Sequence, residues 1–173
     1  VSLGVAFEPE LWDELTEGYG VQGQHRQQAD LLVIQADAMI RQGVSQDAMA
    51  CLRRASAICR EHGLVRTHAK VLERMSFLLS YQGHQMEALE KGKAAIEGFR
   101  RSNSHIAEVN ALVTLGVIER NLGHLEDAMH TTRTALINAH KLGMLVSEAI
   151  ASGNLGSVLL QLGELERTME LCE

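Results

Sequence analysis

The 173-residue chain contains a single proline, Pro9, and aromatic residues make up only 3% of it. Strands favour aromatic side chains, and turn-rich all-β folds use proline freely, so this composition argues against a fold built on sheets. Apolar residues nevertheless amount to 46%, which excludes a chain that is disordered by composition. The remaining bias toward Ala, Leu, Gln and Glu predicts an all-α protein.

Basic residues are also in deficit, with 16 Lys and Arg against 22 Asp and Glu, which gives a net charge of −6. A nucleic-acid-binding domain needs a basic patch, so we expect no nucleic-acid partner. No apolar run approaches the roughly 20 residues that a membrane-spanning helix needs. The first 23 residues show no signal-peptide pattern. We therefore expect a cytoplasmic protein without a membrane partner.

Cysteine is scarce, and Cys51, Cys59 and Cys172 are the three present. An odd number without C-x-x-C spacing fits neither a disulfide framework nor a zinc site. On one helix Cys51 and Cys59 would lie about 12 Å apart, whereas a disulfide needs Cα atoms within about 7 Å. We expect all three to be small buried side chains in a reducing compartment.

Patterns that carry enzyme chemistry are missing as well. The eight histidines form no H-E-x-x-H and no i, i+4 pair, and the chain has no G-x-S-x-G, P-loop or dinucleotide-binding pattern. His84 and His124 share a repeat phase, but equivalent positions of neighbouring repeats are too far apart to bind one zinc ion. We expect solvated turn histidines, no metal, no cofactor and no enzyme activity.

What the chain does contain is a repeat of 40 residues, marked by Gly43, Gly83, Gly123 and Gly163. Small residues recur at three further phases around these glycines. They are Ala36, Ser76, Gly116 and Gly156 before the glycine, then Ala48, Ala88 and Ala128, and then Ala55, Ala95 and Ala135 after it. Four copies in phase define the units 24–63, 64–103, 104–143 and 144–173, the last of which is truncated.

Each unit is predicted to be a pair of helices. In residues 66–82, Val71, Leu72, Met75, Leu78 and Leu79 follow the 3.6-residue spacing of an apolar helix face. The internal glycine then ends the first helix in a left-handed conformation. A second set of residues, Gly63, Asn103 and Gly143, ends the second helices. The recurring small residues allow the two helices of a hairpin to approach closely.

These columns resemble the tetratricopeptide repeat (TPR). The alanines at 48, 88 and 128 and at 55, 95 and 135 match its two alanines, and Gly116 and Gly156 match the small residue of its first helix. The common repeat has about 34 residues, so the 40-residue form is more similar to Pins-type scaffolds, kinesin light chain and bacterial TPR regulators. The resemblance implies a right-handed superhelix of antiparallel helix hairpins, with the first helices lining its concave face.

Both ends of the chain interrupt the repeat. Residues 1–23 fit either the second helix of a partial repeat or an N-terminal capping helix, and residue 173 falls early in the second helix of the last unit. A solenoid needs a polar cap at each end because each repeat contacts only its neighbours. We therefore expect a fragment of a larger signalling or transcription-regulating protein, whose open repeat ends could pair in a homodimer.

The first helices supply the expected binding surface, a groove for a protein or peptide partner with an acidic group. Amide side chains suit the backbone of an extended peptide because they donate and accept hydrogen bonds, and basic side chains suit an acidic group. The alternative is a structural spacer or dimerisation arm with no groove ligand. The groove residues are Lys70, Arg74, Phe77, Tyr81, Asn110, Arg120, Asn121, Asn154 and Gln161.

Overall fold

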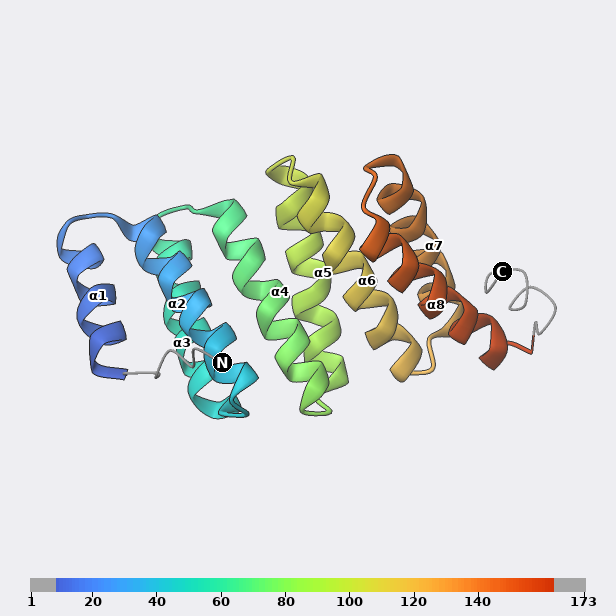
Figure 1. The fold of residues 1–173 in the computed structure, drawn as a ribbon, viewed down its shortest axis with the longest axis horizontal. Helices are drawn as coiled ribbons and strands as arrows, with labels where there is room; N and C mark the ends of the chain where they lie inside the picture. Colours follow the sequence, from blue (N-terminus) through green and yellow to red (C-terminus); the bar gives the residue numbers. More distant parts are fainter. Residues whose placement is uncertain (1–8, 164–173) are drawn as a thin grey trace, which may run out of the picture.

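The computed structural model describes residues 9–163, which form eight α-helices and no strand. Figure 1 shows the helices as a row of antiparallel hairpins that runs from α1 to α8. The helices are α1 (Pro9–Val21), α2 (His25–Arg41), α3 (Ser45–Glu61), α4 (Val65–Tyr81), α5 (Gln85–Arg101), α6 (His105–Asn121), α7 (Leu125–Lys141) and α8 (Leu145–Gln161). The prediction of an all-α superhelix of helix hairpins is confirmed.

Every helix is followed by a residue with positive φ, as the spacing of the glycines predicts. Seven of these residues are glycines, including Gly83 at φ 85°, and the eighth is Asn103 at φ 51°. At the end of α4, the His84 amide donates to the Leu79 carbonyl at 2.9 Å and the Gly83 amide donates to the Ser80 carbonyl at 3.1 Å. These paired bonds satisfy carbonyls that the helix end leaves without a partner, so the glycines fix the reversal of the chain.

Replacing a turn glycine should destabilise the fold, whereas replacing a helical glycine should not. We expect Gly83→Ala to lower the free energy of unfolding by about 1–2 kcal/mol, because a side chain disfavours the left-handed region. Gly153 lies inside α8, where an added Cβ meets open space. The matched Gly153→Ala variant should raise the free energy of unfolding by up to about 1 kcal/mol through helix propensity. Urea unfolding followed by circular dichroism measures both, and equal losses would contradict the prediction.

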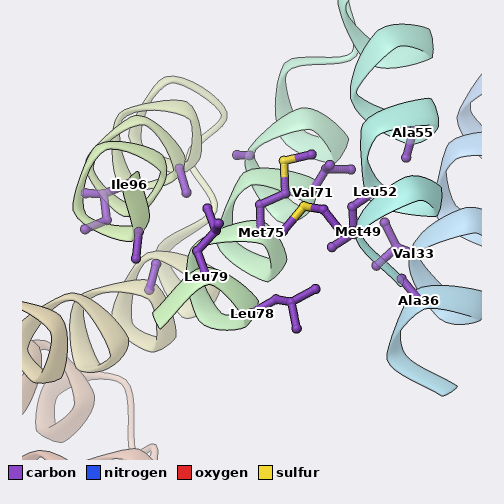
Figure 2. Close-up of a cluster of buried hydrophobic side chains, with 14 of the residues drawn as sticks. Val33, Ala36, Met49, Leu52, Ala55, Val71, Met75, Leu78, Leu79 and Ile96 are labelled. Carbon is purple, nitrogen blue, oxygen red and sulfur yellow. The ribbon is translucent and has the colours of Figure 1, made fainter. Parts of the chain in front are cut away.

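The recurring small residues lie where the two helices of each hairpin touch. The alanines at 48, 88, 128, 55, 95 and 135 are fully buried. In the second unit, the Ser76 hydroxyl donates to the Ala88 carbonyl at 2.7 Å, which joins α4 directly to the backbone of α5. Between hairpins, Met49 and Leu52 of α3 pack against Val71 and Met75 of α4 (Figure 2). The core is therefore a continuous strip that runs along the array rather than a single centre.

The two helices of each hairpin belong to different layers. Helices α2, α4, α6 and α8 contact one another in sequence, whereas within residues 9–163 no such contact joins α3 to α5 or α5 to α7. Helices α3, α5 and α7 are therefore more widely spaced than the first helices, so they lie on the longer, outer arc of a curved array. The first helices form its concave side and the second helices form its convex side. Helix α1 packs on α2, and its Asp13 pairs with Arg54 of α3 at 3.3 Å. None of the described helices is long and apolar enough to span a membrane.

Candidate functional site

A groove runs along the concave side, over helices α2, α4, α6 and α8. It consists of two adjoining hollows, one of about 730 Å³ toward α2 and one of about 490 Å³ toward the C-terminal halves of α4 and α6 and the middle of α8. The hollows share Val113, Thr114 and Ile150 as lining residues, so they are two halves of one surface. A ligand that fills both would contact all four units.

The larger hollow is rich in charge, but most of that charge is already paired. Lys70 Nζ lies 3.5 Å from Asp30 Oδ1, and Arg74 Nε lies 3.2 Å from Asp37 Oδ1. Both pairs join α2 to α4, so they link the first two units as well as lining the groove. An acidic ligand at Lys70 or Arg74 therefore has to compete with an aspartate of the protein itself. Arg66, one turn before Lys70, lines the same hollow and forms no ion pair within the described residues.

Glu73 and Arg74 make the floor of this hollow electrostatically unusual. Burial raises the pKa of Glu73 above its ordinary value, with Asp37 acting in the same direction, while Arg74 and Lys70 act in the opposite direction. The buried Arg74 Nε forms no hydrogen bond within the described chain, although it lies beside Asp37. The charge of Arg74 is thus neutralised by Asp37, and its buried Nε is turned away from solvent.

The smaller hollow is apolar and aromatic with amides at its edge. Phe77 and Tyr81 of α4 form one wall, and the Tyr81 side chain is 80% exposed. Asn121 of α6 and Asn154 of α8 line the same hollow. Exposed aromatic rings of this kind supply large contact areas at a small cost in side-chain entropy, which suits the anchoring of an apolar side chain.

Most of the residues predicted for the groove lie along it. Lys70, Arg74 and Asn110 line the larger hollow, and Phe77, Tyr81, Asn121 and Asn154 line the smaller one. The Ser147 hydroxyl of α8 donates to Asn110 Oδ1 of α6 at 3.0 Å, so this amide also joins two units. Arg120, near the C-terminal end of α6, and Gln161, the last residue of α8, line neither hollow.

Among the groove residues that the predicted set lacks are Arg26, Arg66 and Ser147. Arg66 precedes Lys70 by four residues and so continues the same helix face. Arg26 pairs with Asp30 one turn later at 3.8 Å. Periodicity extended to the first turn of each helix would have found all three, because residues 26, 66 and 147 lie near the starts of α2, α4 and α8.

Three of the histidines make contacts that the sequence does not indicate. No group of three metal-ligating side chains occurs in the described part of the chain. The rings of His25 and His62 stack with centroids 3.5 Å apart, and His68 Nε2 lies 3.0 Å from the Ser56 hydroxyl. Burial, with a contribution from Arg60, lowers the pKa of His68, which favours its neutral form.

The cysteines within the described residues are buried thiols, as predicted. Cys51 and Cys59 are both free, and burial raises the pKa of Cys59 to about 11. A thiol with so high a pKa is almost wholly protonated at neutral pH, so Cys59 is a poor nucleophile. Cys172 lies outside the described residues.

The helix hairpins, with their first helices on the concave side and their second helices on the convex side, form a TPR solenoid. Comparison of the sequence with family models and with curated proteins finds no match. Comparison of the structure finds BtubC (BKLC) from P. vanneervenii, with a TM-score of 0.78 and 16% sequence identity over 94% of this chain and 65% of that chain. A STAND protein with a tetratricopeptide repeat sensor from Pyrococcus horikoshii matches with a TM-score of 0.76 and 20% identity over 85% of this chain and 23% of that one.

A third solved structure is the Rap conjugation gene regulator of the plasmid pLS20 in complex with the Phr* peptide. Its TM-score is 0.68 at 17% identity, over 82% of this chain and 40% of the regulator. This chain therefore spans less than two thirds of each of these three proteins. At such low identity, the likeness establishes the fold that they share with this chain.

Proposed function

We propose that the chain is a protein-interaction scaffold whose concave groove binds an extended segment of a protein partner. The observation that carries this proposal is the continuity of the groove, whose charged half and apolar half meet at Val113, Thr114 and Ile150. The groove is formed by packed helices before any ligand arrives, so binding needs little ordering of the protein. The Rap regulator, which shares the fold, is a precedent in that its structure contains a peptide.

The lining residues define what such a segment should contain. An apolar side chain would fit between Phe77 and Ile150 in the smaller hollow, while Asn121 and Asn154 offer amides to the peptide backbone. In the larger hollow, an acidic group would meet Arg66, because Lys70 and Arg74 already have aspartate partners. The expected ligand therefore has an apolar side chain in one half of the groove and an acidic group in the other half.

Selection of short peptides from a random phage-displayed library on the immobilised chain tests this proposal. The peptides obtained should combine an apolar anchor with an acidic residue. Their affinity, measured by fluorescence anisotropy, should fall at least tenfold in Arg66→Glu and in Asn154→Ala. Arg66 is preferred to Arg74 because its replacement breaks no ion pair within the described residues.

The matched control is Arg133→Glu, which makes the same change of charge on the exposed face of α7, outside both hollows. It should leave the affinity unchanged. Peptides that bind all variants equally, or a library that yields none, would contradict groove binding. Either outcome would favour the second reading of the sequence, a spacer or dimerisation arm without a groove ligand.

A further inference from the structure

The convex side contains a second cleft, distinct from the groove. Because α5 and α7 stand apart, a hollow of about 250 Å³ opens between them, and α6 forms its floor. Leu112 and Leu115 of α6, together with Ile96 of α5, make this floor apolar. Glu119 follows Leu115 by one turn on α6 and places a carboxyl group at one end of the floor.

Glu119 is a departure from the repeat. The equivalent residues of the other units are Met39, Leu79 and Leu159, which are buried parts of the core. Glu119 is buried to the same degree, with 3% of its surface exposed. Its Oε2 atom has no hydrogen-bond partner within the described residues. A buried carboxyl oxygen without a partner is costly, and a residue type found at this phase in one unit alone calls for an explanation.

Two other polar side chains of the cleft already have partners within the protein. Arg100 Nε lies 2.7 Å from Glu108 Oε1, and the Thr134 hydroxyl donates to the His130 carbonyl of its own helix at 2.9 Å. Lys93 and Glu97 of α5 line the cleft and take part in no ion pair within the described residues. With Glu119 ionised, the charged groups of the cleft without an ion-pair partner within the described residues are the carboxylates of Glu119 and Glu97 and the ammonium of Lys93. Together they leave one negative charge that a cationic ligand would complement.

The pKa of Glu119 reflects the same environment. Burial raises it above the ordinary value of 4.5, and Asp127 acts in the same direction. A hydrogen bond from the Thr131 side chain and the charges of Lys93 and His124 act in the opposite direction. Desolvation is the largest of these influences, so the carboxyl group lacks a partner strong enough to offset its burial.

We propose that this cleft binds an alkylammonium or alkylguanidinium group, whose N–H donates to Glu119 Oε2 while its methylene stem lies on Leu115 and Ile96. A charge-assisted hydrogen bond is the strongest interaction available to a buried carboxylate. Leu115 lies roughly 6 Å along the helix axis from Glu119, a distance that a stem of about the length of a lysine side chain covers. The ligand is either a small amine or a lysine or arginine side chain of a protein.

Titration of the isotope-labelled 173-residue chain with n-butylammonium chloride, followed by amide NMR near neutral pH, tests the site. We expect saturable shifts confined to residues 93–100, 112–119 and 130–134. Glu119→Gln, which keeps the shape and removes the charge, should weaken binding at least tenfold. Lys93→Met removes a competing ammonium and should bind at least as tightly as the unaltered chain. n-Butanol, which has the stem without the cation, should bind at least tenfold more weakly.

A parallel titration with N-acetyl-lysine methylamide separates the two sources of the ligand. Binding as tight as that of n-butylammonium would assign the cleft to a protein side chain, and much weaker binding would assign it to a free amine. Equal affinity of the unaltered chain and Glu119→Gln for n-butylammonium would overturn the proposal, because binding would then be apolar alone. The absence of saturable shifts in both the unaltered chain and Lys93→Met would also overturn it. None of these outcomes depends on the concave groove, whose peptides provide a separate readout.

Discussion

The Gly116→Ser variant should lose about 1–3 kcal/mol of free energy of unfolding, and Thr132→Gly in the same chain should restore most of it. A Cβ at Gly116 would clash with Thr132 Oγ1 and would lie 3.5 Å from Thr132 Cβ and 3.6 Å from the Thr132 amide nitrogen. Thr132 is fully buried in α7 and is stiff about its first side-chain torsion, so it cannot turn aside freely. The hairpin of the third unit therefore has room for a side chain on one helix only.

The second unit shows why the rescue should succeed. There the two positions are exchanged, with Ser76 on the first helix and Gly92 on the second. Ser76 Oγ lies 3.0 Å from where a Cβ of Gly92 would be, and it donates to the Ala88 carbonyl. The double variant recreates this arrangement in the third unit, with the new hydroxyl facing the Ala128 carbonyl.

A double-mutant cycle by urea unfolding measures the coupling. Thr132→Gly alone should also destabilise, by about 1 kcal/mol or more, because it adds a glycine to the interior of a helix. The double variant should be more stable than the sum of the two single losses predicts by at least about 1 kcal/mol. Additive losses would show that the two side chains do not share one space.

The repeat could be predicted from the sequence because its signals are local. Glycines at a fixed interval mark the turns, and Ala48, Ala88 and Ala128 mark the hairpin contacts. Each signal depends on backbone geometry or on the volume of one side chain, so it needs no knowledge of distant neighbours. The apolar face of residues 66–82 was predictable for the same reason, and the structure buries or half-buries each of its five apolar residues.

The ion pairs within the groove were not predicted, although one of them could have been inferred from the sequence. Asp30 and Lys70 occupy the same phase of successive units, so their contact could have been inferred by placing adjacent first helices side by side. Arg74 pairs with Asp37, three residues away from its own phase, and this offset depends on how the helices cross. The His25–His62 stack follows no phase of the repeat either, so only the packing of α2 on α3 reveals it.

The role of Glu119 could be predicted from the sequence only in part. The sequence alone shows an acid in a column of Met39, Leu79 and Leu159, which is enough to identify an exception. It does not show whether the side chain turns outward to water or stays in the core. The structure shows that it stays in the core, because α5 and α7 wall the cleft on both sides.

Replacing Glu119 with leucine, the residue of the second and fourth units, should stabilise the fold by about 1–3 kcal/mol at neutral pH. The change removes a buried oxygen without a partner and restores the apolar column. Glu97→Leu is the matched control, since it removes an exposed carboxylate from the same cleft. That surface change should alter the free energy of unfolding by no more than about 0.5 kcal/mol.

The advantage of Glu119→Leu should also depend on pH, in a direction that the pKa of Glu119 fixes. Because this pKa is raised in the folded chain, between 4.5 and the raised value the folded chain keeps a proton that the unfolded chain has released. The stability of the unaltered chain therefore falls as pH rises through this window. Glu73 adds a slope of the same sign, but it is present in both chains and cancels in their difference.

Urea unfolding at several pH values above and below 4.5 should thus show the gap between the two chains widening as pH rises and then levelling off. A difference in free energy of unfolding that is independent of pH would mean that Glu119 contacts water or Lys93 in the folded state. Its oxygen would then already have a partner and would not be free to bind a ligand. A widening gap together with loss of n-butylammonium binding in Glu119→Leu would show that one side chain both weakens the fold and creates the cleft's binding site. Such an exchange of stability for binding is common where a functional group replaces a core residue.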